Sequence, residues 1–115
     1  MAISEAYTSS ATISTTEYSL PNNSTTLAAI TTDGVYQVFL DLAALTTTEE
    51  YLIQVKEKVT SGGTQRVVYS ATVVGLQSAP AWVSPSLILM NGWDVTVKKV
   101  AGTDRSIGWS IRQVA

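Results

Sequence analysis

The chain has 115 residues and a mass of 12.3 kDa, which is the size of one domain and enough to fold without disulfides or structural metals. Cysteine and histidine are absent, which excludes thiolate chemistry and zinc–thiolate sites and removes the commonest general base. A net charge of −2 and a pI near 4.9 argue against a nucleic-acid partner, whose binding surface is normally basic.

Serine and threonine dominate the polar residues. There are 13 Ser and 16 Thr, whereas charged residues make up only 14% of the chain, against about 25% in an average domain. No run approaches the roughly 18–20 apolar residues that span a bilayer, and the first residues lack the basic and apolar segments of a secretion signal. We therefore expect a hydroxyl-rich surface and no membrane partner.

The first 24 residues have few large apolar side chains and ten hydroxyl side chains. Ala11 and Ile13 alternate with threonine and serine, and threonine is a good strand former. We expect residues 1–24 to be an extended N-terminal arm that pairs with the sheet edge of a neighbouring subunit.

The clearest strand runs from Val35 to Leu42, where Tyr36, Val38, Leu40 and Leu42 share one face. Asp33-Gly34 precedes it and is typical of a tight turn. Residues 25–30 are predicted to be the other strand of that hairpin.

Two further hairpins are predicted from period-2 alternation. In the first, residues 51–59 and 67–73 flank the turn Ser61-Gly62-Gly63-Thr64. In the second, residues 93–98 and 107–112 flank the turn at 101–104, and each strand carries one core tryptophan, Trp93 or Trp109. Between the two hairpins, Leu87 to Met90 is apolar without alternation, so it is buried on both faces or covered by a partner.

These elements predict an all-β fold, a single-domain β-sandwich or jelly-roll-like barrel of seven or eight antiparallel strands spanning residues 1–115. Charge is unevenly distributed along the sequence. Residues 1–55 hold six acids and no base, whereas residues 56–115 hold seven bases and three acids. Either strands from the two halves interleave and the charges cancel in space, or the subunit has oppositely charged faces that favour head-to-tail association.

Catalytic motifs are missing from the sequence. It contains no S-x-x-K, G-x-S-x-G, P-loop or G-x-G-x-x-G pattern, and the carboxylate pairs Glu49–Glu50 and Asp94–Asp104 fit a strand and a turn better than acid–base catalysis. Calcium would need Asp33, Asp94 and Asp104 together, but they lack the spacing of a calcium loop. We expect a protein that is not an enzyme and holds no metal or cofactor.

The loop around Trp82 is the candidate contact site. Trp82 stands between two prolines with no core alternation to explain it, and tryptophan is prominent among residues that dominate binding energy at interfaces. The predicted interface residues are therefore Pro80, Trp82, Pro85, Leu87 and Leu89.

Several short phrases resemble small proteins encoded in tailed-phage structural gene clusters. They are Thr32-Asp33-Gly34-Val35-Tyr36-Gln37, Leu40-Asp41-Leu42, Val55-Lys56-Glu57-Lys58-Val59, Gly63-Thr64-Gln65-Arg66 and Gly102-Thr103-Asp104-Arg105-Ser106. They are strand-and-turn phrases, so the resemblance transfers no functional residue. It implies a virion component, either a capsid decoration (cement) protein or a small head or tail accessory subunit.

We therefore expect a non-enzymatic structural subunit of a bacteriophage particle, assembled in the host cytoplasm and located in the virion. Its expected partners are the major capsid protein or other virion subunits and further copies of itself, with a trimer as the expected homo-oligomer. The alternative is a glycan- or receptor-binding β-sandwich of a phage fibre or tail, in which Trp82 stacks on a sugar.

Overall fold

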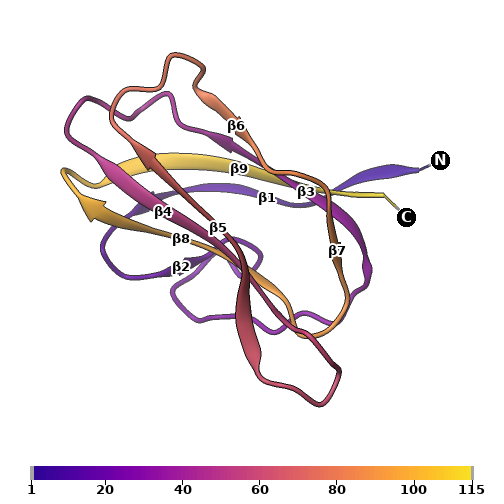
Figure 1. The fold of residues 1–115 in the computed structure, drawn as a ribbon. Coiled ribbons are helices and arrows are strands. Elements are labelled where there is room, and N and C mark those ends of the chain that lie inside the picture. The colour runs from indigo at the N-terminus through magenta and orange to yellow at the C-terminus, as the bar shows by residue number, and fades with distance from the viewer. Residues whose placement is uncertain (1, 115) are drawn as a thin grey trace.

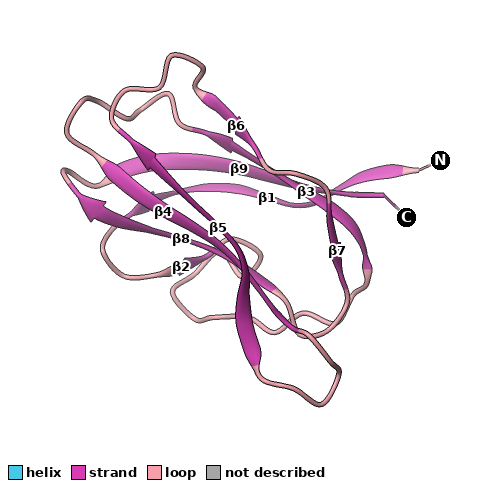
Figure 2. Cartoon of the chain, viewed as in Figure 1, coloured by secondary structure: helices cyan, strands magenta, loops and turns pink. Residues whose placement is uncertain are grey.

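The computed structural model describes residues 2–114, and these fold into nine strands with no helix (Figure 1, Figure 2). Every strand pairing is antiparallel, and the strands form two separate sheets. The predicted all-β sandwich is thus confirmed, as two layers rather than a closed barrel. The strands are β1 (Ile3–Ile13), β2 (Tyr18–Ser19), β3 (Gly34–Asp41), β4 (Glu50–Lys58), β5 (Gln65–Val74), β6 (Ala81–Val83), β7 (Leu87–Leu89), β8 (Asp94–Ala101) and β9 (Arg105–Val114).

Sheet A has the order β1-β9-β3, and the short strands β6 and β7 both pair with the remaining edge of β3. Sheet B has the order β2-β8-β4-β5. Each sheet therefore combines strands from both halves of the sequence, so the acidic first half and the basic second half interleave. The strands of sheet A carry two acids and two bases, namely Glu5, Asp41, Arg105 and Arg112.

The core lies between the two sheets, as alternation predicts. Trp93 and Trp109 are both buried, which confirms their predicted core positions. Trp93 packs against Tyr36 with ring centroids 4.6 Å apart and meets Tyr7 edge-on at 5.8 Å. Such aromatic pairs add roughly 0.5–1.5 kcal/mol beyond the area that they bury.

The final two strands do not form the predicted hairpin. β8 belongs to sheet B and β9 to sheet A, so the turn at residues 102–104 crosses from one layer to the other. This places the apolar faces containing Trp93 and Trp109 opposite each other across the core rather than side by side. Gly102 has a φ of 88°, and a Cβ there would come within 2.6 Å of the Thr48 carbonyl oxygen, so the crossing requires glycine.

The N-terminal segment was predicted to be an arm reaching a neighbouring subunit, and the structure corrects this. Residues 3–13 are an edge strand of sheet A that pairs with β9 along its whole length, from Ile3 opposite Val114 to Ile13 opposite Arg105. Ile13 is fully buried, and Tyr7 packs against the core. The arm thus pairs with a strand of its own chain, β9, rather than with a neighbouring subunit. Residue 1 lies outside the described residues.

Residues 25–30 also differ from the prediction, because they do not pair with β3. Ile30 makes an isolated bridge with Trp93 through two backbone hydrogen bonds of 2.8 and 2.9 Å. β3 is confirmed as a strand, but its neighbours are β9, β6 and β7. The β4–β5 hairpin is confirmed, with Glu50 opposite Val74 and Lys58 opposite Gln65.

Candidate functional site

The five predicted interface residues do not form one exposed site. Trp82 lies on β6 opposite Leu40, and its half-buried side chain packs against the core rather than projecting from a loop. This placement removes Trp82 as a free stacking platform. Pro80 and Pro85 are exposed.

Leu87 and Leu89 face inward as well. Leu89 is 2% exposed, and Leu87 packs on the core, whereas Ile88 between them is 79% exposed. The segment therefore alternates after all; alternation was hidden because the outward residues Ile88 and Met90 are also apolar. Leu87 and Leu89 are core contacts, and the apolar residue that β7 presents to solvent is Ile88.

A different surface has the features of a contact site. We call it the outer face of sheet A: the side chains of β1, β9, β3, β6 and β7 that point away from the core. Inward residues of β3 and β9 such as Val38 and Ile111 are buried, so their sequence neighbours point outward. The outward residues of the two central strands are Val35, Gln37, Phe39 and Asp41 on β3, and Ser106, Gly108, Ser110, Arg112 and Val114 on β9.

An apolar row crosses one end of this face, the end at which β1 begins and β9 ends; Figure 1 shows these two strand ends near each other. Cross-strand pairing places one residue on each of four adjacent strands: Ile3, Val114, Val35 and Ile88. Ile3 and Ile88 are more than half exposed. Such an exposed apolar cluster is characteristic of an interaction surface rather than of scattered surface hydrophobics.

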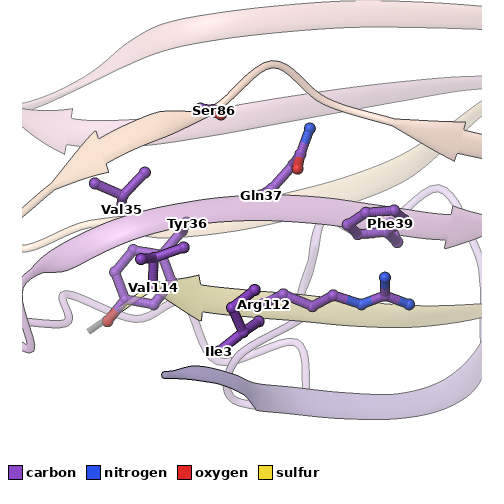
Figure 3. A pocket seen from close by; sticks show the side chains of 8 residues that line it. All are labelled: Ile3, Val35, Tyr36, Gln37, Phe39, Ser86, Arg112 and Val114. Carbon is purple, nitrogen blue, oxygen red and sulfur yellow. The ribbon is translucent and has the colours of Figure 1, made fainter. Parts of the chain in front are cut away.

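Two adjoining cavities hollow the same face. The first, of about 210 Å³, lies over Val35, Gln37 and Val114, and the second, of about 660 Å³, over Asp41, Gly108 and Ser110. Both are lined by Phe39 and Arg112. The Arg112 guanidinium carbon lies 3.8 Å from the centre of the Phe39 ring, a cation–π contact that forms part of both linings; Figure 3 shows it in the first hollow.

Hydrogen bonds hold the polar groups of this face in place. The Arg112 Nε donates to the Ser110 hydroxyl at 3.2 Å, and that hydroxyl donates to a Glu5 carboxylate oxygen. The Gln37 side chain donates to the Ser84 carbonyl at 2.7 Å, which ties β3 to the loop after β6. The face therefore offers polar groups held in fixed positions around one aromatic ring.

Gly108 forms the floor of the second cavity. A Cβ at this position would meet the Asp41 and Ser10 side chains at 3.8 and 3.9 Å, which is ordinary contact. Neither space nor backbone geometry therefore requires a glycine here, although glycine weakens a strand by roughly 0.5–1 kcal/mol relative to alanine. A glycine in such a strand position is typical of a site that something else approaches closely.

Two buried carboxylates lie away from this face, and each is fully engaged by the fold. Glu49 accepts hydrogen bonds from the Thr48 hydroxyl and from the Thr46 backbone and hydroxyl groups, and its Oε1 lies 3.1 Å from the Arg105 Nε as an ion pair. The Thr48 and Thr46 hydrogen bonds, which outweigh the effect of burial, hold the pKa of Glu49 well below its usual range. Glu49 thereby fastens the β3–β4 loop to the start of β9.

Asp94 is buried and accepts hydrogen bonds from the Ser19 hydroxyl and from the backbone amides of Ala28 and Val95, at 2.8 to 2.9 Å. Burial raises the pKa of Asp94, opposed by these three donors. Asp94 therefore positions the segment that connects β2 to β3. Asp104, considered with Asp94 as a carboxylate pair and assigned to a turn, forms an ion pair with Lys99.

Among residues 2–114, no three acidic side chains come close enough together to hold a metal ion. The same residues contain no helix long and apolar enough to cross a membrane.

The sequence prediction missed Phe39 and Arg112, the centre of the outer face of sheet A. One signal was present: residues 35–42 carry apolar side chains on both faces, since Val35 and Phe39 alternate with the core residues. An apolar residue on the outer face of a sheet that has one solvated side indicates a contact. Arg112 could not be placed beside Phe39 without the register of β9 against β3.

No family model matches the chain, and no curated protein matches it. Among solved structures, the chain is similar to one described as a xylan-binding domain from CBM 22, formally x6b domain. The TM-score is 0.41 and the sequence identity 16%, over 86% of this chain and 64% of that one.

Proposed function

We propose that the protein is a non-enzymatic structural subunit of a bacteriophage particle, attached to the capsid as a decoration protein through the outer face of sheet A. Its location is then the virion, and its partner the major capsid protein or another virion subunit. The phage assignment depends on the sequence phrases that resemble tailed-phage structural proteins. The attachment surface depends on the structure, above all on the apolar row that contains Ile3 and Ile88.

The composition of this face suits a permanent contact. It has few charged side chains. Arg112 already stacks on Phe39 and donates a hydrogen bond to Ser110. Docking therefore costs little in the desolvation of charged groups. Fully burying one exposed side chain such as Ile88 contributes about 1.5–3 kcal/mol. Repeated at every copy on a shell, contacts of this size would stabilise a particle without any catalytic group.

The proposal is tested on purified phage particles and on two matched variants. Ile88→Asp introduces a carboxylate into the apolar row, and Val100→Asp introduces the same group at an exposed position at the end of β8. We expect the wild-type chain and V100D to sediment with the particles, and I88D to bind at least about tenfold more weakly, since tenfold corresponds to about 1.4 kcal/mol. Recovery of the wild-type chain only in the soluble fraction, or equal binding of both variants, would contradict the proposal.

A glycan-binding module of a phage fibre or tail is the second candidate, because the second cavity combines polar groups with an aromatic wall. Asp41, Ser110 and Arg112 surround the hollow over Gly108, and Phe39 forms one side of it. Hydroxyl-rich ligands need such fixed donors and acceptors next to an apolar surface. Binding to a broad glycan panel that Asp41→Ala abolishes would favour this candidate, whereas no binding by the wild-type chain would remove it.

A further inference from the structure

Arg112 is a cation held in place on the outer face of sheet A with part of its hydrogen-bonding capacity unused. The Phe39 ring supports the guanidinium from β3, and the Nε donates to the Ser110 hydroxyl. The other two guanidinium nitrogens, Nη1 and Nη2, have no hydrogen-bond acceptor among residues 2–114. Because the planar guanidinium is already oriented, it loses little conformational freedom when it binds an acceptor.

Glu5 stands directly opposite Arg112 on β1, yet the two side chains form no ion pair within the described chain. The Ser110 hydroxyl links them instead, since it donates to the Glu5 carboxylate and accepts from the Arg112 Nε. Three other bases each form an ion pair with a carboxylate, at 2.5 to 3.1 Å. The Arg112 guanidinium leans away from β1 and over Phe39 on β3, which brings it to the two cavities.

The first cavity joins this cation to an apolar surface. Its lining runs along β3 from Val35 to Phe39, a length of about 13 Å at 3.3 Å per residue. Ile3, Val35 and Val114 make one end apolar, and Arg112 extends over Phe39 at the other end (Figure 3). Arg112 is the one charged residue among the described residues of this lining. Such a cavity suits a ligand that is apolar at one end and negatively charged at the other.

A partner that covers this face has to satisfy the remaining N–H groups of Arg112. The guanidinium cannot lose its proton, so a contact that supplies no acceptor buries a charge without a partner. The cost of docking therefore stays small only if the partner brings an acceptor to Nη1 and Nη2. A single base without a second cation in the lining matches one carboxylate better than a phosphate, which carries more charge.

We propose that the first cavity binds an extended peptide segment through one acidic side chain and one apolar side chain. The carboxylate of that segment accepts two parallel hydrogen bonds from Nη1 and Nη2 of Arg112. Its apolar side chain lies at the end of the cavity formed by Ile3, Val35 and Val114. Residues i and i+4 of an extended segment point to the same side about 13 Å apart, so the two side chains are four residues apart.

This inference rests on the proposed attachment through the outer face of sheet A, and it states the chemistry of the partner there. The partner is a virion subunit that presents an extended acidic segment. The apolar row and the cation then act together, because the row supplies buried area and Arg112 selects for a carboxylate at a fixed distance from it.

A peptide titration followed by NMR tests the site without particles. The probe is acetyl-Leu-Thr-Thr-Thr-Asp-amide, and the matched probe has Asn in place of Asp, so the two differ only in the carboxylate. We expect the Asp peptide to shift the Arg112 Nε–H signal and the Ile3 and Val35 methyl signals, with a Kd at least about tenfold lower than that of the Asn peptide. Equal Kd values, or no shift at several millimolar Asp peptide, would overturn the proposal. Tighter binding of an Asn peptide with a free C-terminal carboxylate would assign the site to a chain end and would also overturn it.

The variant Arg112→Gln removes the charge, and Arg66→Gln makes the same change at an exposed position on β5. R112Q should bind the Asp and Asn peptides equally, whereas R66Q should keep the preference of the wild-type chain. Arg112→Lys keeps the charge without the planar pair of donors and should lose most of the preference. A preference for the Asp peptide that persists in R112Q would show that another group binds the carboxylate.

Particle sedimentation separates this inference from the proposed attachment. If I88D and R112Q both weaken binding to particles and R66Q does not, both claims are supported. If I88D weakens binding and R112Q does not, attachment through this face stands and the carboxylate site is wrong. If neither variant weakens binding but the Asp peptide binds through Arg112, the site stands and the proposed attachment is wrong.

Discussion

Tyr51 joins the two layers of the sandwich through its hydroxyl group, and its removal is expected to be costly. The side chain is fully buried on β4. Its hydroxyl donates to the Ile13 carbonyl at 3.0 Å and accepts from the Arg105 amide at 2.8 Å, so it links sheet B to β1 and β9 of sheet A. Burial raises the pKa of Tyr51 further above its ordinary value of 10.0, so the hydroxyl is protonated and able to donate at neutral pH.

Tyr51→Phe keeps the ring and its volume but leaves both partners without a hydrogen bond. The buried Ile13 carbonyl bears the full desolvation penalty of about 1–3 kcal/mol, and the half-buried Arg105 amide loses a net bond of about 0.5–1.5 kcal/mol. We therefore expect the free energy of unfolding to fall by roughly 2–4 kcal/mol.

Urea denaturation measures this change, with Tyr36→Phe as the matched control. Tyr36 is equally buried, but its hydroxyl makes one hydrogen bond, at 2.9 Å to the carbonyl of the exposed residue Thr32, which also accepts from the Trp93 Nε1. Its removal should cost about 0.5–1.5 kcal/mol. If Y51F destabilises the protein no more than Y36F, the hydroxyl of Tyr51 does not hold the layers together and the reasoning is wrong.

Glu49→Gln should make the free energy of unfolding fall less steeply as the pH is lowered. A carboxyl whose folded-state pKa is depressed stabilises the protein fully above its unfolded-state pKa of 4.5, and this stabilisation is lost as the pH falls through the folded-state pKa. Urea midpoints between pH 7 and pH 2 should therefore fall more steeply for the wild-type chain than for E49Q, and parallel curves would contradict this. Gly108→Ala should raise the free energy of unfolding by about 0.5–1 kcal/mol, because the added Cβ meets only ordinary contacts. The same variant should weaken binding to the outer face of sheet A in the particle sedimentation assay, and a destabilised G108A would show that the strand itself needs the glycine.

Alternation located the long strands from sequence because each has one buried face, and Trp93 and Trp109 were placed in the core for the same reason. Which strands pair could not be predicted in the same way. The apolar faces of β8 and β9 are compatible with a hairpin in one sheet and equally with two strands that lie in different sheets and face each other across the core. The choice depends on Gly102 passing close over Thr48, a contact between residues distant in sequence.

The contact site was harder to predict than the fold, because it depends on register. Leu87 and Leu89 look like interface residues in a continuous apolar run, and only the pairing of β7 with β3 shows that they face the core. Conversely, Arg112 looks like an isolated surface cation in the sequence. It becomes part of a site only because β9 places it opposite Gln37, where it reaches the Phe39 ring.

A cryo-electron microscopy reconstruction of a particle that contains the protein tests the central claim most directly. The account predicts density for the β-sandwich on the shell, with the outer face of sheet A against the capsid and both Phe39 and Ile88 in the contact. Density that shows this face turned to solvent, or a particle whose shell lacks the chain altogether, would contradict it.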